Sequence, residues 1–242
     1  GDQWVISGQK SSWVSNGTIA TQALTFLGVD RSRGASGSAV AIIPLDAPGV
    51  TRGKPLDKLG QRALNQGEIF FDEVRIPKHY MLVPTEAYPF IIESVLAGAN
   101  AGMGAIFTGV ARAAFEEALS YTRGRIQGGV AICEHQAVQL KLMDMFIRVE
   151  AARQLSRAAM AYNSQTVPPA LQYSVASKVF CTQAAFTVSS DAVQLHGGMG
   201  LAKGVLVEKL LRDARASMIE DGTNEVLSLG AARRVIDSYN CG

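Results

Sequence analysis

The spacing of hydrophobic and polar residues changes character near residue 90. Before that point, short apolar and β-branched runs alternate with turn residues: WVISGQK (4–10), ATQALTFLGV (20–29), SAVAIIPLD (38–46) and GEIFFDEVRIP (67–77). The stretch SNGT between the first two runs is a strong turn signal, and Pro77 ends the last run. Several short strands separated by turns predict an antiparallel sandwich or barrel.

After residue 90 the apolar residues recur with a period of 3.6, which is typical of amphipathic helices. Residues 111–125 alternate an Ala/Phe/Leu face with Glu and Arg, and residues 135–162 carry a continuous apolar stripe. Residues 171–197 predict a third long helix, and residues 223–239 predict a fourth. Long helices joined by short links predict an up-and-down bundle.

Together the two patterns predict the α+β class: a partial antiparallel β-barrel or sandwich followed by an up-and-down four-helix bundle. We expect a β domain over residues 1–88 and a C-terminal helical domain over residues 89–242. The β pattern starts within three residues of Gly1, so we expect the chain to begin inside a domain.

Composition excludes several classes of function. The chain has 242 residues, of which 48% are hydrophobic, so it can form one large domain or two small ones. The formal charge of +2, with basic and acidic residues interspersed, predicts no binding to nucleic acid. We find neither a secretory signal nor an apolar run of 18 residues, which predicts a soluble protein that does not bind or span a membrane.

Cysteine and histidine usage predicts neither a disulfide framework nor a metal site. The three cysteines are far apart and form no CxxC pair: Cys133, Cys181 and Cys241. The first two lie in apolar-periodic segments and are interpreted as reduced core thiols, which favours a cytoplasmic location. None of the three histidines stands four residues from another ligand in a metal motif.

One segment near the C-terminus carries candidate chemistry. In ASMIEDGTNEVLSLGAARRVI (216–236), Glu220 and Asp221 precede Gly222 and Thr223 on the threshold of the last predicted helix. An aspartate before Gly-Thr-Asn is a good context for helix capping. A carboxylate at such a turn is also suited to act as a base in a pocket. These residues alone leave both interpretations open.

Four segments point further: WVISGQKSSWVSNG, GEIFFDEVRIP, RGRIQGGVAICEHQAVQLKLMDM, and the stretch from QLHGGMG through RDAR to EDGTNEV. In this order and spacing they resemble four motifs of the acyl-CoA dehydrogenase flavoprotein superfamily. Each motif alone is loose, but the four together cover essentially the whole chain. The resemblance implies a β domain and a four-helix C-terminal domain with FAD between them.

The first motif implies contacts with the flavin ring. It places Trp13, Val14 and Ser15 against the isoalloxazine. The Ser15 hydroxyl can donate a hydrogen bond to flavin N5 or O4, and the Trp13 indole can cover the ring face. The alternative is a tryptophan in the β core and a serine in a turn.

The third and fourth motifs imply contacts with the rest of FAD. Arg125 aligns with an arginine that pairs with the pyrophosphate across a dimer interface, a role suited to a guanidinium fork. Gln127 holds a polar position after it, and Gly128 stands where the family has Phe. Three residues align with the segment that meets the adenosine half of a neighbour's FAD: Gln194, Gly197 and Gly198. The alternatives are a solvated charge at a helix end for Arg125 and an ordinary glycine C-cap.

The resemblance implies that the residue before Gly222 is the base that removes the α-proton of a thioester. That residue is Asp221, with Glu220 as the alternative, and Gly222 lies beside the substrate. Thr223 and Glu225 hold FAD-contact positions. The family usually has Glu as the base, and an aspartate is shorter by about 1.5 Å. A misplacement of roughly 1 Å can cost about a hundredfold in rate, so the pocket is reshaped or the substrate differs.

Further departures lie on the substrate side. Ala99 occupies the position where some members place the base, and Asn100 follows where many carry a substrate-holding Arg. We take Asn100 as a candidate substrate contact. Nitroalkane oxidases of the superfamily use an aspartate base but carry an arginine seven positions later, which is Ser228 here.

The leading hypothesis is the C-terminal portion of an FAD-dependent acyl-CoA dehydrogenase of fatty acid metabolism. It would form the α,β-unsaturated thioester, pass electrons to an electron-transfer flavoprotein and assemble as a homodimer or homotetramer. The first alternative is a superfamily oxidase or monooxygenase on a non-CoA substrate such as a nitroalkane. The second is a non-catalytic oligomerising fragment, since the family's N-terminal helical domain does not precede Gly1.

Overall fold

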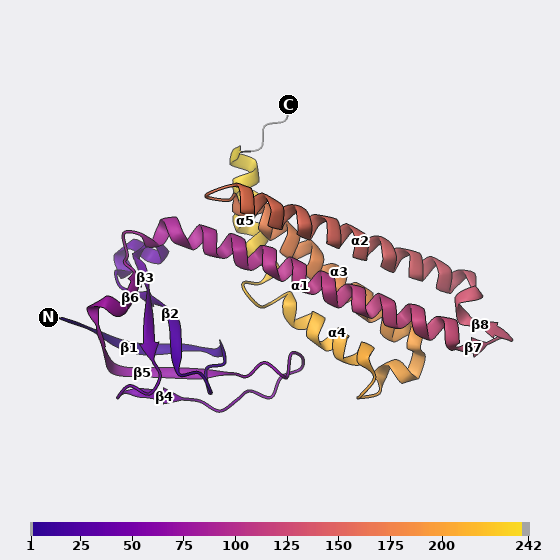
Figure 1. Cartoon of the computed structure of the whole chain (residues 1–242), viewed down its shortest axis with the longest axis horizontal. Coiled ribbons are helices and arrows are strands. Elements are labelled where there is room, and N and C mark those ends of the chain that lie inside the picture. Colours follow the sequence, from indigo (N-terminus) through magenta and orange to yellow (C-terminus); the bar gives the residue numbers. More distant parts are fainter. Residues whose placement is uncertain (1, 239–242) are drawn as a thin grey trace. The chain divides into compact units, whose positions relative to one another are not determined.

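The computed structural model describes residues 2–238 and forms two compact units, Gly1–Ile92 and Glu93–Gly242. The first unit consists of antiparallel sheets and the second of helices, which confirms the predicted fold class (Figure 1). Cys241 and Tyr239, the end of the last predicted helix, lie outside the described residues.

Two three-stranded antiparallel sheets form the first unit. One sheet has the order β1-β5-β4, with the bounds β1 Gln3–Ser15, β5 Gln66–Pro77 and β4 Val50–Arg52. The other has the order β2-β3-β6, with the bounds β2 Gln22–Gly28, β3 Ser38–Pro44 and β6 Met81–Val83. Two 3-10 turns complete the unit, η1 Arg31–Gly37 and η2 Lys78–Tyr80.

The buried residues of β5 show why the sheet has an irregularity. Ile69 and Phe71 point to the core with the usual two-residue spacing, but the next buried residue is Val74. A change of parity would turn the following apolar residues to solvent unless one strand has an extra residue. The β1–β5 register shifts between Ile6 and Gly8 at this level, so the apolar face stays continuous.

Five α-helices form the second unit: α1 Tyr88–Gly124 (which begins in the first unit), α2 Gln136–Gln165, α3 Leu171–His196, α4 Leu206–Ser217 and α5 Asn224–Ser238. A two-stranded hairpin, β7 Ile126–Gln127 with β8 Val130–Ala131, follows α1. Two 3-10 turns, η3 Ile132–Glu134 and η4 Gly197–Leu201, precede α2 and follow α3.

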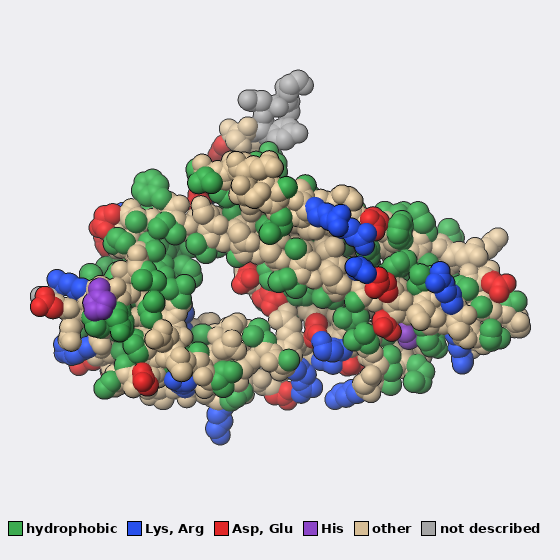
Figure 2. Space-filling view, in the orientation of Figure 1, with side chains coloured by type: hydrophobic (Ala, Val, Ile, Leu, Met, Phe, Trp, Pro, Cys, Tyr) green, Lys and Arg blue, Asp and Glu red, His purple; other side chains and the backbone are tan. Residues whose placement is uncertain are grey.

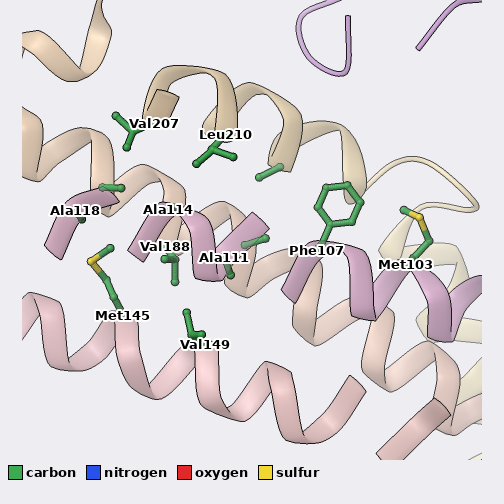
Figure 3. Close-up of a cluster of buried hydrophobic side chains, with 13 residues drawn as sticks. Met103, Phe107, Ala111, Ala114, Ala118, Met145, Val149, Val188, Val207 and Leu210 are labelled. Atoms are coloured by element: carbon green, nitrogen blue, oxygen red, sulfur yellow. The ribbon is translucent and has the colours of Figure 1, made fainter. Parts of the chain in front are cut away.

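Side chains from four helices meet in the core of this unit (Figure 3). They come from α1 to α4 and include Phe107, Met145, Val188 and Leu210. Alanines fill the positions of closest approach and are fully buried: Ala111, Ala114, Ala118, Ala185, Ala192 and Ala214. Small side chains at these contacts let the helix axes approach closely.

Helix α4 is the α-helix that the hydrophobic spacing of the sequence did not lead us to predict. Its apolar residues Val207, Leu210 and Ala214 follow a helical spacing and are buried. The opposite face is charged, and Arg212 Nε donates to Glu208 Oε1 at 2.6 Å, one turn away. The spacing was therefore present in the sequence, but over only 12 residues.

Helix α1 is the one described helix that is long and apolar enough, by length and composition, to cross a membrane. An 18-residue window of it has a mean hydropathy of 1.5, and a third of that window is buried. Because α1 also supplies Met103 and Phe107 to the bundle core, its apolar character has a packing explanation.

Charged side chains of both signs lie on the surface, and the two described cysteines differ in burial. Acidic and basic side chains are interspersed over the visible face of the helices (Figure 2). Cys181 is buried and free, as predicted for a core thiol. Cys133 is free but only partly buried, so its interpretation as a core residue was wrong. It lies in the turn η3, where the helical period does not apply.

Candidate active site

The turn between α4 and α5 presents Asp221. Helix α4 ends at Ser217, and the Asn224 N–H donates to the Met218 carbonyl at 3.0 Å, which closes the loop. Within it Asp221 has φ of 52° and Gly222 has φ of 97°. Asparagine, aspartate and glycine are the residues that adopt such left-handed conformations most readily. The Asp-Gly pair is therefore the local reason for the sharp turn.

The capping interpretation of Asp221 finds no support in the structure. The first-turn amide of Val226 donates to Thr223 Oγ1 at 3.3 Å, so Thr223 caps α5. Within residues 2–238 no amide of α5 donates to Asp221, whose side chain is exposed. The dry surroundings that a carboxylate base needs would have to come from a bound flavin and substrate.

The buried side chain of Lys178 supports this turn from below. Its Nζ donates to the Gly222 carbonyl at 2.7 Å and to Asn224 Oδ1 at 2.9 Å. Burial lowers the pKa of Lys178, and attraction to Asp221, Glu220 and Glu225, in that order, opposes the shift. Sequence reasoning missed Lys178, although a lysine on the apolar stripe of a helix was a signal that could have revealed it.

The other predicted residues of this segment lie close to Asp221 in the chain. Glu220 is half-buried, and its N–H donates to the Ala216 carbonyl at 3.2 Å. Thr223 is half-buried as the cap, and Glu225 is exposed on the first turn of α5. The three carboxylates that attract Lys178 therefore lie within six consecutive residues of the chain.

Asn100 lies inside the bundle rather than on an open surface. Its side chain is fully buried in α1, and Nδ2 donates to the Leu96 carbonyl at 2.8 Å. Its Oδ1 is one of two buried side-chain oxygens or nitrogens without a hydrogen-bond partner in the described residues. An unpaired buried acceptor costs free energy, and it could accept a hydrogen bond from a ligand that reached it.

A second group of predicted residues gathers where α1 and α3 end. Tyr121 on α1 stacks on His196 on α3 with ring centroids 4.2 Å apart. Nδ1 of His196 lies 2.7 Å from the Ala192 carbonyl, a hydrogen bond that orients the ring. Arg125 lies one turn after Tyr121, and Gly197 directly follows His196. The ring stack therefore brings the segment with Arg125 and the segment with Gly197 to one end of the unit. Neither aromatic residue was singled out from the sequence.

Arg125 and Gln127 lead into the β7–β8 hairpin, and both are exposed. Within residues 2–238, Arg125 has no carboxylate within ion-pair distance. Gly128 and Gly129 form the hairpin turn with φ of 64° and 86°. Two successive positive φ angles define a turn that favours glycine, which accounts for the glycines at both positions.

The segment with Gln194, Gly197 and Gly198 closes α3. Gly197 has φ of 59°, and its N–H donates to the Gln194 carbonyl. A Cβ added at Gly197 or Gly198 would have no atom within 4 Å, so the space beside this backbone is open. Lys178 and Gly197 are 19 residues apart, which corresponds to about 28 Å along the helix axis.

In the first unit, Trp13, Val14 and Ser15 end β1. Val14 packs on the β core, whereas the Trp13 side chain is 61% exposed and Ser15 is exposed. Trp13 is therefore not a core tryptophan, which removes the alternative considered from the sequence. The Trp13 carbonyl accepts from Gln66 Nε2 at 3.4 Å, and Val14 pairs with Gly67.

Taken unit by unit, exposed residues have the chemistry that separate parts of a flavin dinucleotide require. An exposed indole can cover an aromatic ring, an exposed guanidinium can pair with phosphates, and an open glycine turn lets a ligand approach the backbone. The residues concerned are Trp13, Arg125 and Gly198. Among the described residues, no group of three or more His, Cys, Asp or Glu could hold a metal ion.

Comparison with known proteins identifies the class. The model of the acyl-CoA dehydrogenase C-terminal domain matches residues 90–236, and that of the middle domain matches residues 1–74. The chain therefore belongs to the acyl-CoA dehydrogenase family, whose members are FAD-dependent oxidoreductases.

Particular relatives agree with this assignment. The chain is 34% identical to the mitochondrial short-chain specific acyl-CoA dehydrogenase of Bos taurus, over 99% of this chain and 58% of that protein. The butyryl-CoA dehydrogenase of Megasphaera elsdenii superposes with a TM-score of 0.89 and 31% identity, covering 97% of this chain and 61% of that one. A chain reported with the electron transferring flavoprotein of Acidaminococcus fermentans superposes with a TM-score of 0.90 and 32% identity. The match covers 98% of this chain and 62% of that one. The chain thus spans about three fifths of the length of these relatives.

Proposed function

We propose that this chain supplies the base and part of the FAD site of an acyl-CoA dehydrogenase. The reaction is the oxidation of an acyl-CoA to its α,β-unsaturated thioester. The observation that carries the proposal is the presentation of Asp221: its carboxylate is exposed on a left-handed turn whose neighbours are anchored, and Thr223 rather than Asp221 caps α5.

The role of Asp221 is to accept the α-proton of the thioester at a carboxylate oxygen. A bound FAD supplies the acceptor for the β-hydride, at N5 of its ring. Substrate and flavin would cover the exposed carboxylate and exclude water, which favours proton transfer. Because aspartate is shorter than the family's usual glutamate by about 1.5 Å, the turn must hold it closer to the substrate.

Other residues of the chain would bind rather than react. The Trp13 indole would cover the ring and the Ser15 hydroxyl would donate to N5 or O4. Arg125 would pair with the pyrophosphate. The distance of about 28 Å along α3 between Lys178 and Gly197 supports contacts with two different FAD molecules, the second belonging to a neighbouring subunit. Thr223 and Glu225 beside the turn would contact FAD, as would Gln127.

Assembly and electron transfer belong to the same proposal. Helix α2 exposes a row of large apolar side chains that a second subunit would cover in a homodimer or homotetramer: Leu140, Met143, Phe146 and Ile147. The likeness to a chain reported with an electron transferring flavoprotein supports such a flavoprotein as the electron acceptor.

The test is anaerobic reduction of the flavin in the protein at its natural length. We expect a flavin spectrum that bleaches with acyl-CoA thioesters. Asp221→Asn should retain the flavin and slow its reduction by about a hundredfold or more, because the amide cannot accept the proton. Glu220→Gln is the matched control and should stay within a few-fold of the wild type. If only the Glu220 variant loses activity, the base has been misassigned.

A second candidate is an oxidase on a non-CoA substrate such as a nitroalkane. The aspartate at position 221 and the buried Asn100 in place of a substrate-holding arginine favour it, whereas Ser228 in place of the oxidases' arginine disfavours it. Bleaching by nitroalkanes but not by acyl-CoAs would select this function. A purified protein without flavin would select the non-catalytic fragment.

A further inference from the structure

Lys178 is the largest fully buried side chain in the described part of the chain. Removing an ammonium group from water costs several kcal/mol unless hydrogen-bond acceptors replace the water. Two acceptors do so here, the Gly222 carbonyl at 2.7 Å and Asn224 Oδ1 at 2.9 Å. Both belong to the segment that presents Asp221, so the buried cation and the turn depend on each other.

The side chain of Asn224 extends this contact to a second residue of α3. An ammonium can only donate, so Asn224 must turn its oxygen to Lys178 and its amide nitrogen away. Nδ2 then donates to Thr182 Oγ1 at 3.0 Å. Thr182 lies one turn after Lys178 on the same face of α3. Helix α3 therefore holds the turn at Gly222 and the first residue of α5 at Asn224.

The backbone conformation of the turn shows what these hydrogen bonds from α3 stabilise. Asp221 has φ of 52°, a conformation that is less favourable for aspartate than for glycine and is retained more firmly when the surroundings hold it, whereas Gly222 adopts its φ of 97° without strain. The Gly222 carbonyl is fixed by Lys178, and the Cα atoms of Asp221 and Gly222 are about 3.8 Å apart. Release of that carbonyl would let the peptide planes rotate and displace the carboxylate, and a misplacement of roughly 1 Å can cost about a hundredfold in rate.

We propose that Lys178 is a positioning residue: its buried ammonium, together with Asn224 and Thr182, fixes the turn that aims the Asp221 carboxylate. The proposal rests on the proposed role of Asp221 as the base. Attraction between Lys178 and Asp221 acts in the same direction as the two hydrogen bonds. Lys178 does not touch the reacting atoms and acts through the turn alone.

The test compares Lys178→Met with the wild type in the FAD-loaded protein at its natural length. Methionine keeps the length and volume of the side chain but removes its donors. We expect amides of residues 219–226 to exchange with deuterium about tenfold faster or more, while amides of α2 stay within about twofold. Reduction of the flavin by acyl-CoA should slow by roughly a hundredfold in kcat, with KM changed less than about threefold.

Matched variants separate position from general damage. Lys203→Met removes an exposed lysine and should change neither the exchange nor kcat. If Lys178→Met does not fold, Thr182→Val of similar size leaves the Asn224 amide without its acceptor. It should then raise exchange of residues 219–226 about threefold or more.

The outcomes distinguish this proposal from the proposed function. Unchanged exchange of residues 219–226 in Lys178→Met, or in Thr182→Val where the first variant is unfolded, overturns the role of Lys178. A loss of kcat that is matched by an equal rise in KM also overturns it, because the defect would then lie in binding. If Asp221→Asn still reduces the flavin, the proposed base is wrong, and the exchange result alone still decides whether Lys178 holds the turn.

Discussion

Replacing Gly222 by alanine tests whether the turn conformation is required. Gly222 has φ of 97°, outside the conformations that L-residues ordinarily adopt. A Cβ at this position would lie 3.1 Å from Cγ and Cδ2 of Leu227. Alanine therefore either accepts the strain and displaces Leu227, or changes the turn and pulls the carbonyl away from Lys178.

The magnitude follows from three contributions. Strain of an L-residue at positive φ costs about 1–2 kcal/mol. Displacing the Leu227 side chain from its rotamer costs about 0.5–1.5 kcal/mol. The lower entropy of alanine in the unfolded chain offsets about 0.4–1 kcal/mol. We expect Gly222→Ala to lower the free energy of unfolding of the helical unit by about 0.5–3 kcal/mol.

Gly230 provides a matched control in the helix that follows. It lies in α5, is exposed, and a Cβ there would meet no atom within 4 Å. Gly230→Ala should raise the free energy of unfolding by about 0.5–1 kcal/mol, because glycine within a helix is unfavourable. The two identical substitutions should thus act in opposite directions.

The assay is urea unfolding followed by far-UV circular dichroism, with the rate of flavin reduction measured on the same preparations. Gly222→Ala should reduce both the midpoint and the reduction rate, and Gly230→Ala only raise the midpoint. A Gly222→Ala protein as stable as Gly230→Ala would refute the conclusion that the turn needs a positive φ. An unchanged reduction rate would show that the turn does not determine the carboxylate position.

Two further predictions concern the bundle core. Gly104→Ala should lower the free energy of unfolding of the helical unit by about 1–3 kcal/mol, since its Cβ would lie 2.3 Å from Ser177 Oγ. Gly102→Ala in the same helix meets no atom within 4 Å and should raise that free energy. In chemical unfolding, adding Ser177→Ala should restore the stability that Gly104→Ala loses. Burial raises the pKa of the Cys181 thiol above 9.0, so iodoacetamide should alkylate the partly exposed Cys133 well before Cys181 in peptide mapping. The folded state holds the Cys181 proton more tightly than the unfolded state does, so the stability contributed by the protonated thiol is lost as pH rises from 9.0 through the raised pKa. Cys181→Ala should therefore weaken this loss of stability at alkaline pH. Equal alkylation rates of the two cysteines would contradict the burial of Cys181.

Much of the fold was predictable because its signals are local. The aromatic and β-branched run over residues 67–77 and the 3.6 period over residues 171–197 predicted β5 and α3 almost to their ends. Helix α4 was not predicted because its 12 residues are rich in charge and its helical spacing of apolar residues extends over only this short stretch. The prediction that Cys133 lies in the core was wrong because a helical period was assigned to a residue that lies in a turn.

The candidate site was predictable only as separate segments. Motifs pointed to Trp13, Arg125 and Asp221, but they could not tell that the Trp13 side chain is exposed or that Thr223 caps α5. Both facts depend on which face of an element is covered. Asn100 was expected beside the substrate, and its burial inside the bundle depends on how α1 packs on its neighbours.

The sequence by itself determined the order of strands and helices and the residue types that suit a flavin and a base, because these depend on neighbours in the chain. Tertiary structure alone decided that Lys178 reaches Gly222 and Asn224, 44 and 46 residues away. No local pattern encodes that contact. A buried ammonium finds its acceptors only after the packing of α3 on α5 has removed water from around it.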